Sequence, residues 1–400
     1  MSEDAGRVPE RAEVGTPPVA SRVVAAILGV DVRVTILAFV AAFTLGAILL
    51  ALSDPRTLEA ITSGEGLGVI VSSAMGAVSR AYGALVRGSL GSAGALSETL
   101  VAATVLILTG LAVTIPLRAG LFNIGGEGQV IAGGLAGGYV GFAVEGLPLV
   151  VHLPLAVVAA MAGGALIGWI PGVLKARTGA HEVISTIMLN NTLNFVAIWL
   201  LTTALFQVPG RADPISRNIL ETARMPRPLT GLRVDVGIVL ALVIALVVMW
   251  LLDRSTIGFE LNAVGANPSA ATASGMDVGR VTIRAMTFAG IAGGIAGAAL
   301  VLGVQGRITP GFSAGLGFDG ITVALLGRGT VGGTVAAGLL LGALKAGGRA
   351  MQARSGTALD LVVVIQAFII VFVAAPGLVR ALFRIRARPT TTNISQGWGS

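Results

Sequence analysis

The stretch that decides the fold is Thr99–Gln129, TLVAATVLILTGLAVTIPLRAGLFNIGGEGQ. Its first part, Thr99–Leu117, is an apolar run, and a helix needs about 20 such residues to cross a bilayer. Its second part, Gly120–Gln129, places one carboxylate and two amides at the start of the next apolar stretch. Polar groups inside a membrane usually face a cavity or pathway, because a charge at mid-bilayer costs at least about 2.5 kcal/mol. The sequence therefore predicts membrane helices interrupted by a polar, glycine-rich break.

The composition of the whole chain supports a membrane protein. Hydrophobic residues make up 54% and charged residues only 12%, whereas soluble domains carry about 25% charged residues. The mean hydropathy is +0.88. The 57 glycines suit helices that pack backbone to backbone in lipid. There is no cysteine, and the two histidines, His152 and His181, are far apart in sequence. A thiolate metal site is therefore excluded, and we expect no metal and no catalytic centre.

Apolar runs recur along the chain and predict an all-α, polytopic transmembrane bundle of about eight to ten spans. The first run begins too far from the start for a cleaved signal peptide, so it is expected to be a signal-anchor helix. The runs are Val34–Leu52, Thr99–Leu117, Leu121–Val144, Leu149–Leu174, Ile184–Phe206, Val236–Leu252, Ile283–Val304, Gly315–Leu326, Gly332–Ala350 and Leu359–Val379.

Arginines at both ends of the apolar region set the expected orientation. They precede the first span and follow the last, so both termini are predicted to be cytoplasmic. Residues 1–21 are predicted to be a disordered cytoplasmic tail, residues 22–380 the transmembrane domain and residues 381–400 a basic cytoplasmic tail. The same scheme places segment 253–283 on the cytoplasmic side of the membrane. Gln207–Val234 carries five arginines although the scheme puts it outside, and this loop argues against the assignment.

A second glycine-interrupted span lies in the other half of the chain. Gly315–Gly320 contains one acid, Asp319, inside apolar sequence. Paired breaks in corresponding halves are the best sequence pointer to the central site of a transporter. Between the breaks, three polar residues recur every four positions and so share one helix face. The predicted pathway residues are Asn123, Glu127, Gln129, Thr186, Asn190, Asn194 and Asp319. Two alternatives stay open: Glu127 pairs with a neighbouring helix, and the amides only join helices.

Enzyme motifs in the chain lack the context they need. Gly311–Gly315 spells a nucleophile elbow, which requires a strand-turn-helix and a nearby histidine. An intramembrane hydrolase centred on Ser313 is therefore a minor alternative. No Gly-Lys-Ser or Gly-Lys-Thr occurs, and Lys175 and Lys345 are the only lysines, so an ATP-binding phosphate loop is absent. We expect neither an enzyme nor a bound cofactor.

Two further segments are predicted to lie outside the spans. Val69–Val86 is weakly amphipathic and is expected to lie along the outer surface. In the inside segment Ala263–Met276, Asn267 and Pro268 can open a short helix and Gly275 can close it. Such a helix can dock a partner, or it can be an ordinary solvated loop helix.

Four motifs together resemble one family. They are GLFNIGGEGQ at Gly120–Gln129, HEVISTIMLNN at His181–Asn191, AVGANPSAA at Ala263–Ala271 and GFDGITVALLGR at Gly317–Arg328. They look like the permease subunits of bacterial ABC importers for nucleosides and simple sugars, in the superfamily of branched-chain amino-acid and ribose permeases. The resemblance spans about Leu96–Leu378 in the right order. Asn191 departs from it, since the family often has an aromatic residue there.

The resemblance implies an inner-membrane pathway subunit that imports nucleosides, purine nucleosides above all, or simple sugars by alternating access. Its implied partners are a second, related permease in a heterodimer, an ATPase with two nucleotide-binding domains that uses the ATP, and an extracytoplasmic substrate-binding lipoprotein. No nucleic acid is expected. An ion-coupled secondary transporter of small polar solutes is the alternative. The residues that match the family's ATPase-coupling helix are Val264, Gly265, Ala266, Asn267, Pro268, Ala270, Ala271 and Gly275.

Overall fold

The computed structural model describes residues 30–384, which are almost entirely helical, as predicted. The isolated β-bridge between Gln207 and Ser216 is the only extended pairing among these residues. The predicted tail 1–21 lies outside the described residues, as does most of the predicted tail 381–400.

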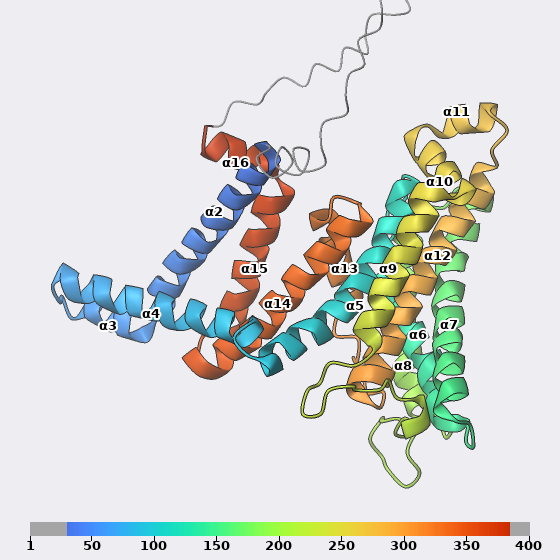
Figure 1. Cartoon of the computed structure of the whole chain (residues 1–400), viewed down its shortest axis with the longest axis horizontal. Coiled ribbons are helices and arrows are strands. Elements are labelled where there is room, and N and C mark those ends of the chain that lie inside the picture. Colours follow the sequence, from blue (N-terminus) through green and yellow to red (C-terminus); the bar gives the residue numbers. More distant parts are fainter. Residues whose placement is uncertain (1–29, 385–400) are drawn as a thin grey trace, which may run out of the picture.

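The helices follow one another with short connections, apart from one long segment between α8 and α9 (Figure 1). They are α2 (Val30–Ser53), α3 (Pro55–Thr62), α4 (Leu67–Ser89), α5 (Ala93–Arg118), α6 (Gly126–Ala143), α7 (Leu149–Thr178), α8 (Glu182–Leu201), η1 (Glu221–Ala223), α9 (Gly237–Arg254), α10 (Thr256–Ala266), α11 (Pro268–Ala273), α12 (Val278–Ala298), η2 (Ala299–Gln305), α13 (Leu316–Leu326), α14 (Val331–Ser355), α15 (Leu359–Ala374) and α16 (Pro376–Leu382).

Two apolar cores lie on either side of α5. The larger core joins α5 to α6, α7, α8, α9, α10 and α12. The smaller core joins α2, α4, α14 and α15. Leu108 of α5 belongs to the first core and Leu106 to the second. Figure 1 shows α5 running obliquely between the two groups of helices. This helix therefore connects the two halves of the molecule.

Glycines allow the central helices to approach closely. A Cβ at Gly164 of α7 would lie 2.2 Å from the carbonyl oxygen of Gly290 in α12. A Cβ at Gly342 of α14 would lie 2.8 Å from the backbone nitrogen of Ala103 in α5. Helices packed this closely have no room for larger side chains. The backbone-to-backbone packing expected from the glycine content is confirmed.

Among residues 30–384, eight helices are long and apolar enough to cross a membrane, and α15 with α16 makes up to nine as a pair bent by 88°. The number agrees with the predicted eight to ten. The expected span Leu121–Val144 is corrected, because its helix, α6, begins only at Gly126. The expected span Gly315–Leu326 is the short helix α13 of 11 residues. Both breaks predicted from glycine are therefore real interruptions of the helical backbone.

The two ends of the bundle can be distinguished by what they carry. Figure 1 shows the beginning of α2, α16 and α11 toward one end of the molecule. The long segment between α8 and α9 lies at the other end. The predicted coupling segment thus shares its end with the first and last described helices. This arrangement is the one that two cytoplasmic termini would require, and the orientation itself stays a prediction.

Candidate functional site: two half-helices that begin side by side

The helices α6 and α13 start next to each other in the interior of the bundle. A Cβ at Gly317 in the first turn of α13 would lie 2.2 Å from the backbone nitrogen of Glu127 in the first turn of α6. A Cβ at Gly126 would lie 2.8 Å from the carbonyl oxygen of Gly317. Only glycine at these two positions lets the helix ends meet. Each helix N-terminus carries unpaired N–H groups and a partial positive charge, so the junction needs acceptors.

The side chain of Glu127 supplies acceptors to the start of α13. The backbone N–H of Gly317 donates to Oε2 at 2.8 Å, and that of Gly315 donates to Oε1 at 3.2 Å. The Ser313 hydroxyl also donates to Oε1. Glu127 and Ser313 are both buried, with 3% and 1% exposure. A carboxylate from one broken helix therefore caps the other.

Asn190 of α8 caps the start of α6 in the same way. Its Oδ1 accepts the backbone N–H of Gly128 at 2.8 Å, and its Nδ2 donates to the carbonyl of Ile124 at 2.9 Å. The polar stripe predicted on this helix thus satisfies backbone groups that the break in front of α6 frees. In lipid, such groups must find partners within the protein.

Asn123 holds the non-helical turn that leads into α6. Its Oδ1 accepts the N–H of Gly125 at 2.9 Å, while its Nδ2 donates to the carbonyl of Ala112 at 3.0 Å and to Oε1 of Gln129 at 3.1 Å. Asn123 and Gln129 are fully buried. These contacts fix the turn against α5, which carries Ala112.

The predicted pathway residues thus divide into three groups. Asn123, Glu127, Gln129 and Asn190 form one buried polar cluster at the junction, and Thr186 lies beside it with its hydroxyl bonded to its own helix. Asn194 is only half-buried and donates to the carbonyl of Asn190 at 3.2 Å. Asp319 is separate from the cluster and pairs with Lys345 of α14 at 2.7 Å.

A charged cavity of about 390 Å³ lies next to α13 on the side of Lys345. It is bounded by residues of α5, α14, η2 and the segment before α9. Glu98 accepts from Arg233 at 3.1 Å and from Arg349 at 3.4 Å. The cavity lining is Glu98, Val101, Ala102, Val105, Arg233, Leu300, Val304, Ala314, Leu316, Lys345 and Arg349. This site was not predicted from the sequence, because its charged residues come from three distant segments. Each of these segments looks like the end of a membrane span.

The serine singled out by the nucleophile-elbow spelling has another partner. Ser313 donates to Glu127, and the segment Gly311–Gly315 is a run of turns before α13 with no strand in front of it. His152 contacts Thr222 and the carbonyl of Val140, and His181 lies at the start of α8 near Glu182. The geometry that a serine hydrolase needs is therefore missing around Ser313.

The predicted coupling segment consists of two short helices, α10 and α11, at one end of the bundle (Figure 1). Asn267 caps α11 by accepting the N–H of Ala270 at 3.1 Å, and Pro268 occupies the first turn, as predicted. Gly275 ends this element with a φ of +85°. Among the predicted coupling residues, Val264 and Ala271 are buried and Gly265 is partly buried. The exposed ones are Ala266, Asn267, Pro268, Ala270 and Gly275.

The α10–α11 element touches the backbone that leads into the polar cluster. A Cβ at Gly265 would lie 2.1 Å from the carbonyl oxygen of Arg118, at the end of α5. Arg118 Nε donates to the carbonyl of Gly329 at 3.1 Å, just after α13. The exposed element thus contacts the segment before α6 directly and is linked to the end of α13 through the Arg118 side chain.

Comparison with known proteins matches this architecture to one family. The family model described as the permease component of branched-chain amino acid transport systems matches residues 95–374. The guanosine ABC transporter permease protein NupP of Bacillus subtilis is 39% identical over 81% of this chain and 93% of its own length. No solved structure matches this chain.

Two further relatives extend the likeness. The glucose ABC transporter permease protein TsgB13 of Haloferax volcanii is 36% identical over 73% of this chain and 79% of its own length. The nucleoside ABC transporter permease protein NupB of Lactococcus lactis is 32% identical over 81% of this chain and 92% of its own length. All three relatives carry names of permeases for nucleosides or sugars.

Proposed function

Since this chain belongs to the permease component family of branched-chain amino acid transport systems, we infer that it is the membrane pathway of an ABC importer for nucleosides or simple sugars. It is a multi-pass protein of the inner membrane and acts as a pathway subunit, not as an enzyme in its own right. The observation that carries this function is the match of the family model to residues 95–374.

The finer substrate assignment is a purine nucleoside. Its support is the 39% identity to NupP, whose name specifies guanosine, over 93% of the length of that relative. An uptake panel with purine nucleosides, pyrimidine nucleosides and pentoses tests the assignment. The expected result is saturable uptake of a purine nucleoside that the other two classes fail to compete away. Preferred uptake of a pentose would overturn it.

The proposed partners are an ATPase with two nucleotide-binding domains, an extracytoplasmic binding lipoprotein and a second permease that completes a heterodimeric pore. The relatives are named as permease proteins of ABC transporters, and such a subunit needs an ATPase and a substrate-binding partner. The heterodimer is supported by the spelling NIGGEGQ at residues 123–129, which is similar to one of two permease types in nucleoside systems. Co-purification with differently tagged copies of each permease distinguishes a heterodimer from a homodimer.

The proposed pathway runs along α13, between the buried polar cluster and the charged cavity. Broken helices provide such sites in transporters, because their ends offer backbone groups and their two halves can move separately. In this proposal, one side of the route is supported or lined by Asn123, Glu127, Gln129, Thr186, Asn190 and Asn194. Asp319 lies on the other side, with Lys345 beside the cavity.

The proposed coupling step starts at the exposed surface of α10 and α11, against which the ATPase docks. A displacement of Gly265 would push on the backbone at Arg118 and Gly120, with which it is in close contact. Gly120 precedes Glu127 by only seven positions, and Arg118 also holds the carbonyl of Gly329. One movement can thereby shift both half-helices relative to each other, which is what alternating access requires.

A further inference from the structure

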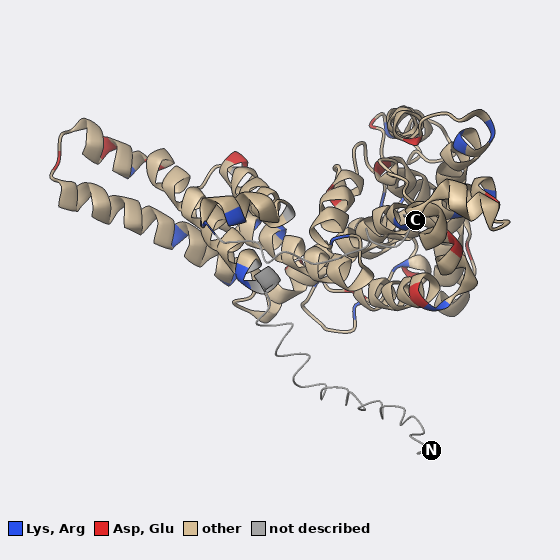
Figure 2. Cartoon of the chain, turned by 90° about the horizontal axis from the view of Figure 1, so that it is seen from above, with Lys and Arg blue, Asp and Glu red and all other residues tan. Residues whose placement is uncertain are grey.

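The helical hairpin α3–α4 projects sideways from the bundle, as two perpendicular views show (Figure 1 and Figure 2). It follows α2 at the end away from α16, and it precedes the region matched by the family model, which begins at residue 95. Only the second half of α4 is fixed to the bundle: a Cβ at Gly347 of α14 would lie 2.5 Å from the carbonyl oxygen of Leu85. The first half of α4 extends beyond the other helices.

The side chains of α4 separate into two faces. At about 100° per residue, the larger apolar residues of α4 fall within one arc of about 100°, except Val69, which lies on the side of Arg87, and Ile70. Arg80 and Arg87 fall on the opposite side, seven positions apart. Much of the apolar arc is uncovered, for Leu67 is 80% and Met75 64% exposed. The apolar arc consists of Leu67, Val71, Met75, Val78, Tyr82, Leu85 and Val86, of which Val78, Tyr82 and Leu85 pack against the smaller core.

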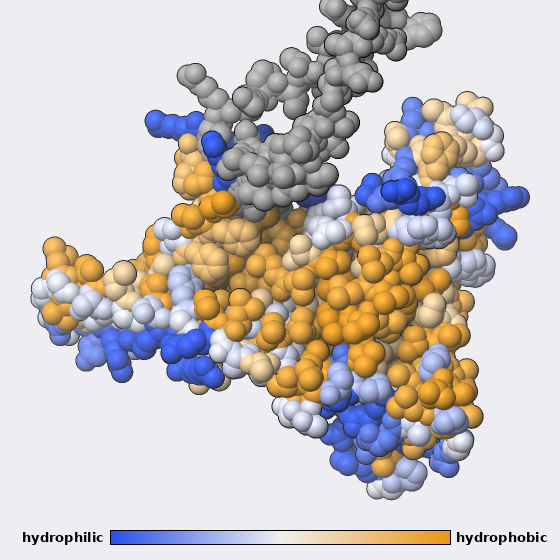
Figure 3. Space-filling view, in the orientation of Figure 1, coloured by the Kyte–Doolittle hydropathy of each residue, from blue (hydrophilic) through white to orange (hydrophobic). Residues whose placement is uncertain are grey.

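The hairpin lies across the direction of the bundle helices. Figure 3 shows hydrophilic residues along the edge of the hairpin that faces away from α16, and hydrophobic residues along the edge that adjoins the apolar surface of the bundle. Helix α4 is long and apolar enough to span a membrane. Its position and its two faces instead match an amphipathic helix lying in the headgroup layer, with its apolar side in the acyl chains.

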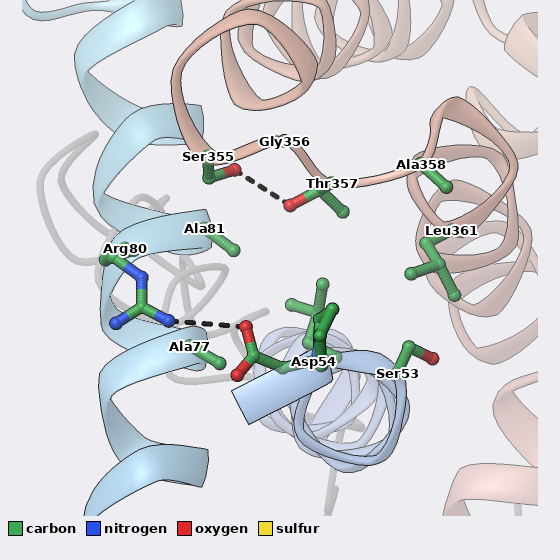
Figure 4. A pocket seen from close by; sticks show the side chains of 12 residues that line it. Ser53, Asp54, Ala77, Arg80, Ala81, Ser355, Gly356, Thr357, Ala358 and Leu361 are labelled. Atoms are coloured by element: carbon green, nitrogen blue, oxygen red, sulfur yellow. Dashed lines mark hydrogen bonds and ion pairs between the residues drawn. The ribbon is translucent and has the colours of Figure 1, made fainter. Parts of the chain in front are cut away.

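A cavity of about 380 Å³ lies where the hairpin joins the bundle (Figure 4). Arg80 Nη2 lies 3.3 Å from Oδ1 of Asp54, and the guanidinium side chain remains 46% exposed. Across the cavity, the hydroxyls of Ser355 and Thr357 are 2.8 Å apart. The apolar side chains of Leu50 and Leu361 also line it. The cavity thus combines one cation, one anion and three hydroxyls, the third from Ser53, with an apolar wall.

We propose that the α3–α4 hairpin lies in the headgroup layer of the leaflet opposite α11, and that the cavity at its base binds a phospholipid with a phosphate and a primary amine. The Arg80 guanidinium matches the phosphate, since guanidinium groups bind phosphate oxygens through several N–H donors. The Asp54 carboxylate matches the ammonium group, and the hydroxyl oxygen of Thr357 can accept from the same group, because the Ser355 hydroxyl donates to the carbonyl of Met351 and accepts from Thr357. Leu50 and Leu361 lie against the start of the acyl chains.

Spin labels on two adjacent residues test the position of the hairpin. The natural chain has no cysteine, so Val86→Cys and Arg87→Cys each provide one labelling site. The two sites share one position along the helix axis but point about 100° apart. In bilayer nanodiscs we expect the Val86 label to be reached by oxygen and the Arg87 label by a water-soluble nickel complex. Equal accessibility at both sites would show that α4 spans the bilayer, and shielding of Val86 from both reagents would indicate a protein partner. Either result overturns the proposal.

Retention of lipid by the purified chain tests the cavity. After exchange into equal amounts of phosphatidylethanolamine, phosphatidylcholine and phosphatidylglycerol, native mass spectrometry should show preferential retention of phosphatidylethanolamine. Arg80→Gln should lower this retention about ten-fold, the effect of one hydrogen bond to a charged group. Arg87→Gln is the matched control, since Arg87 lies on the same face outside the cavity, and it should retain the lipid. Equal loss in both variants, or retention without headgroup preference, would overturn the proposal.

Discussion

The carboxylate of Glu127, at the start of α6, accepts the backbone N–H of Gly317, at the start of α13, at 2.8 Å. The two residues are 190 positions apart and belong to the two broken segments of the chain. One hydrogen bond thus joins the interruptions that the sequence places in its two halves. It links the stability of the junction to the proposed movement of the half-helices.

Replacing the carboxylate by an amide tests this link. In Glu127→Gln, one acceptor oxygen becomes an NH₂ group that faces the N–H and O–H donors of α13. A buried donor left without an acceptor costs about 1–3 kcal/mol. We expect the variant to reach the membrane, to lose transport and to melt at a lower temperature in a fluorescence assay. Glu127→Ala should lower transport more than assembly, whereas equal losses of both would favour a purely structural role.

Adding a methyl group at the junction should prevent close approach. The Cβ of Gly317→Ala would lie 2.2 Å from the backbone nitrogen of Glu127, and backbone cannot move aside as a flexible side chain can. Overpacking in a well-packed core costs about 1–3 kcal/mol. We expect a large loss of monodisperse protein in size-exclusion chromatography. Gly332→Ala is the control, because no atom lies within 4 Å of its added Cβ. Normal recovery of Gly317→Ala would contradict the packing described above.

The contact at Gly265 predicts a specific uncoupling phenotype. Gly265→Arg should leave the protein in the membrane but abolish co-purification and stimulation of the ATPase, because the side chain would displace α10 from Arg118. Deletion of Ala266–Ala273 should act in the same way. Gly332→Arg adds the same charge at an exposed site in the first turn of α14, where no atom lies within 4 Å of an added Cβ, and should bind the ATPase normally. Unchanged ATPase stimulation by Gly265→Arg would refute the coupling proposal.

The ion pair between Asp319 and Lys345 separates a pathway role from a packing role. Asp319→Asn should reduce uptake several-fold with little change in yield, because the pair is partly exposed and borders the cavity. Surface ion pairs contribute only about 0–1 kcal/mol to stability. The double variant Asp319→Lys with Lys345→Asp restores an ion pair between α13 and α14 but exchanges the positions of the negative and the positive charge. Full recovery of uptake in the double variant would indicate that only the contact matters.

A buried acid outside the spans predicts a pH dependence of stability. Burial raises the pKa of Asp235, opposed by the N–H of Gly237 and the charge of Arg227. A raised pKa in the folded state means that ionisation of Asp235 weakens folding, so the contribution of this group to stability is largest below the ordinary aspartate pKa of about 4 and is lost as pH rises through the raised value. At pH values between the ordinary aspartate pKa and the raised pKa of Asp235, the melting temperature of the natural chain should fall as the pH rises. Asp235→Asn should flatten this part of the curve, and an unchanged slope would contradict the assignment.

Sequence patterns predicted the membrane bundle and both helix breaks because these depend on local composition. Glycines together with polar side chains inside apolar sequence located the interruptions before α6 and α13. The partners of the polar residues depend on tertiary structure and could not be predicted. Asn190 caps a turn 62 positions away, and Ser313, singled out as a possible nucleophile, instead donates to Glu127 from 186 positions away. No local pattern distinguishes a residue that lines a pathway from one that caps a helix in lipid.

The charged cavity beside α13 could not be predicted from local sequence patterns either. Glu98, Arg233 and Arg349 each lie near the end of a helix, where charged residues are expected in any membrane protein. Their ion pairs bridge more than 130 positions of sequence. Only the packing of α5 against both α14 and the segment before α9 brings them to one cavity. The helix α11 itself was easier to predict, because Asn267 and Pro268 start it through contacts within four residues.

The central claim is that this chain is a passive pathway driven by a separate ATPase. The most direct measurement is purine nucleoside uptake into proteoliposomes that hold the chain with its second permease and the ATPase, with binding protein outside and ATP inside. Our account predicts accumulation against a gradient that requires ATP, is blocked by vanadate and persists with a protonophore. Accumulation by the chain alone, without ATPase, that collapses with a protonophore would instead identify an ion-coupled carrier.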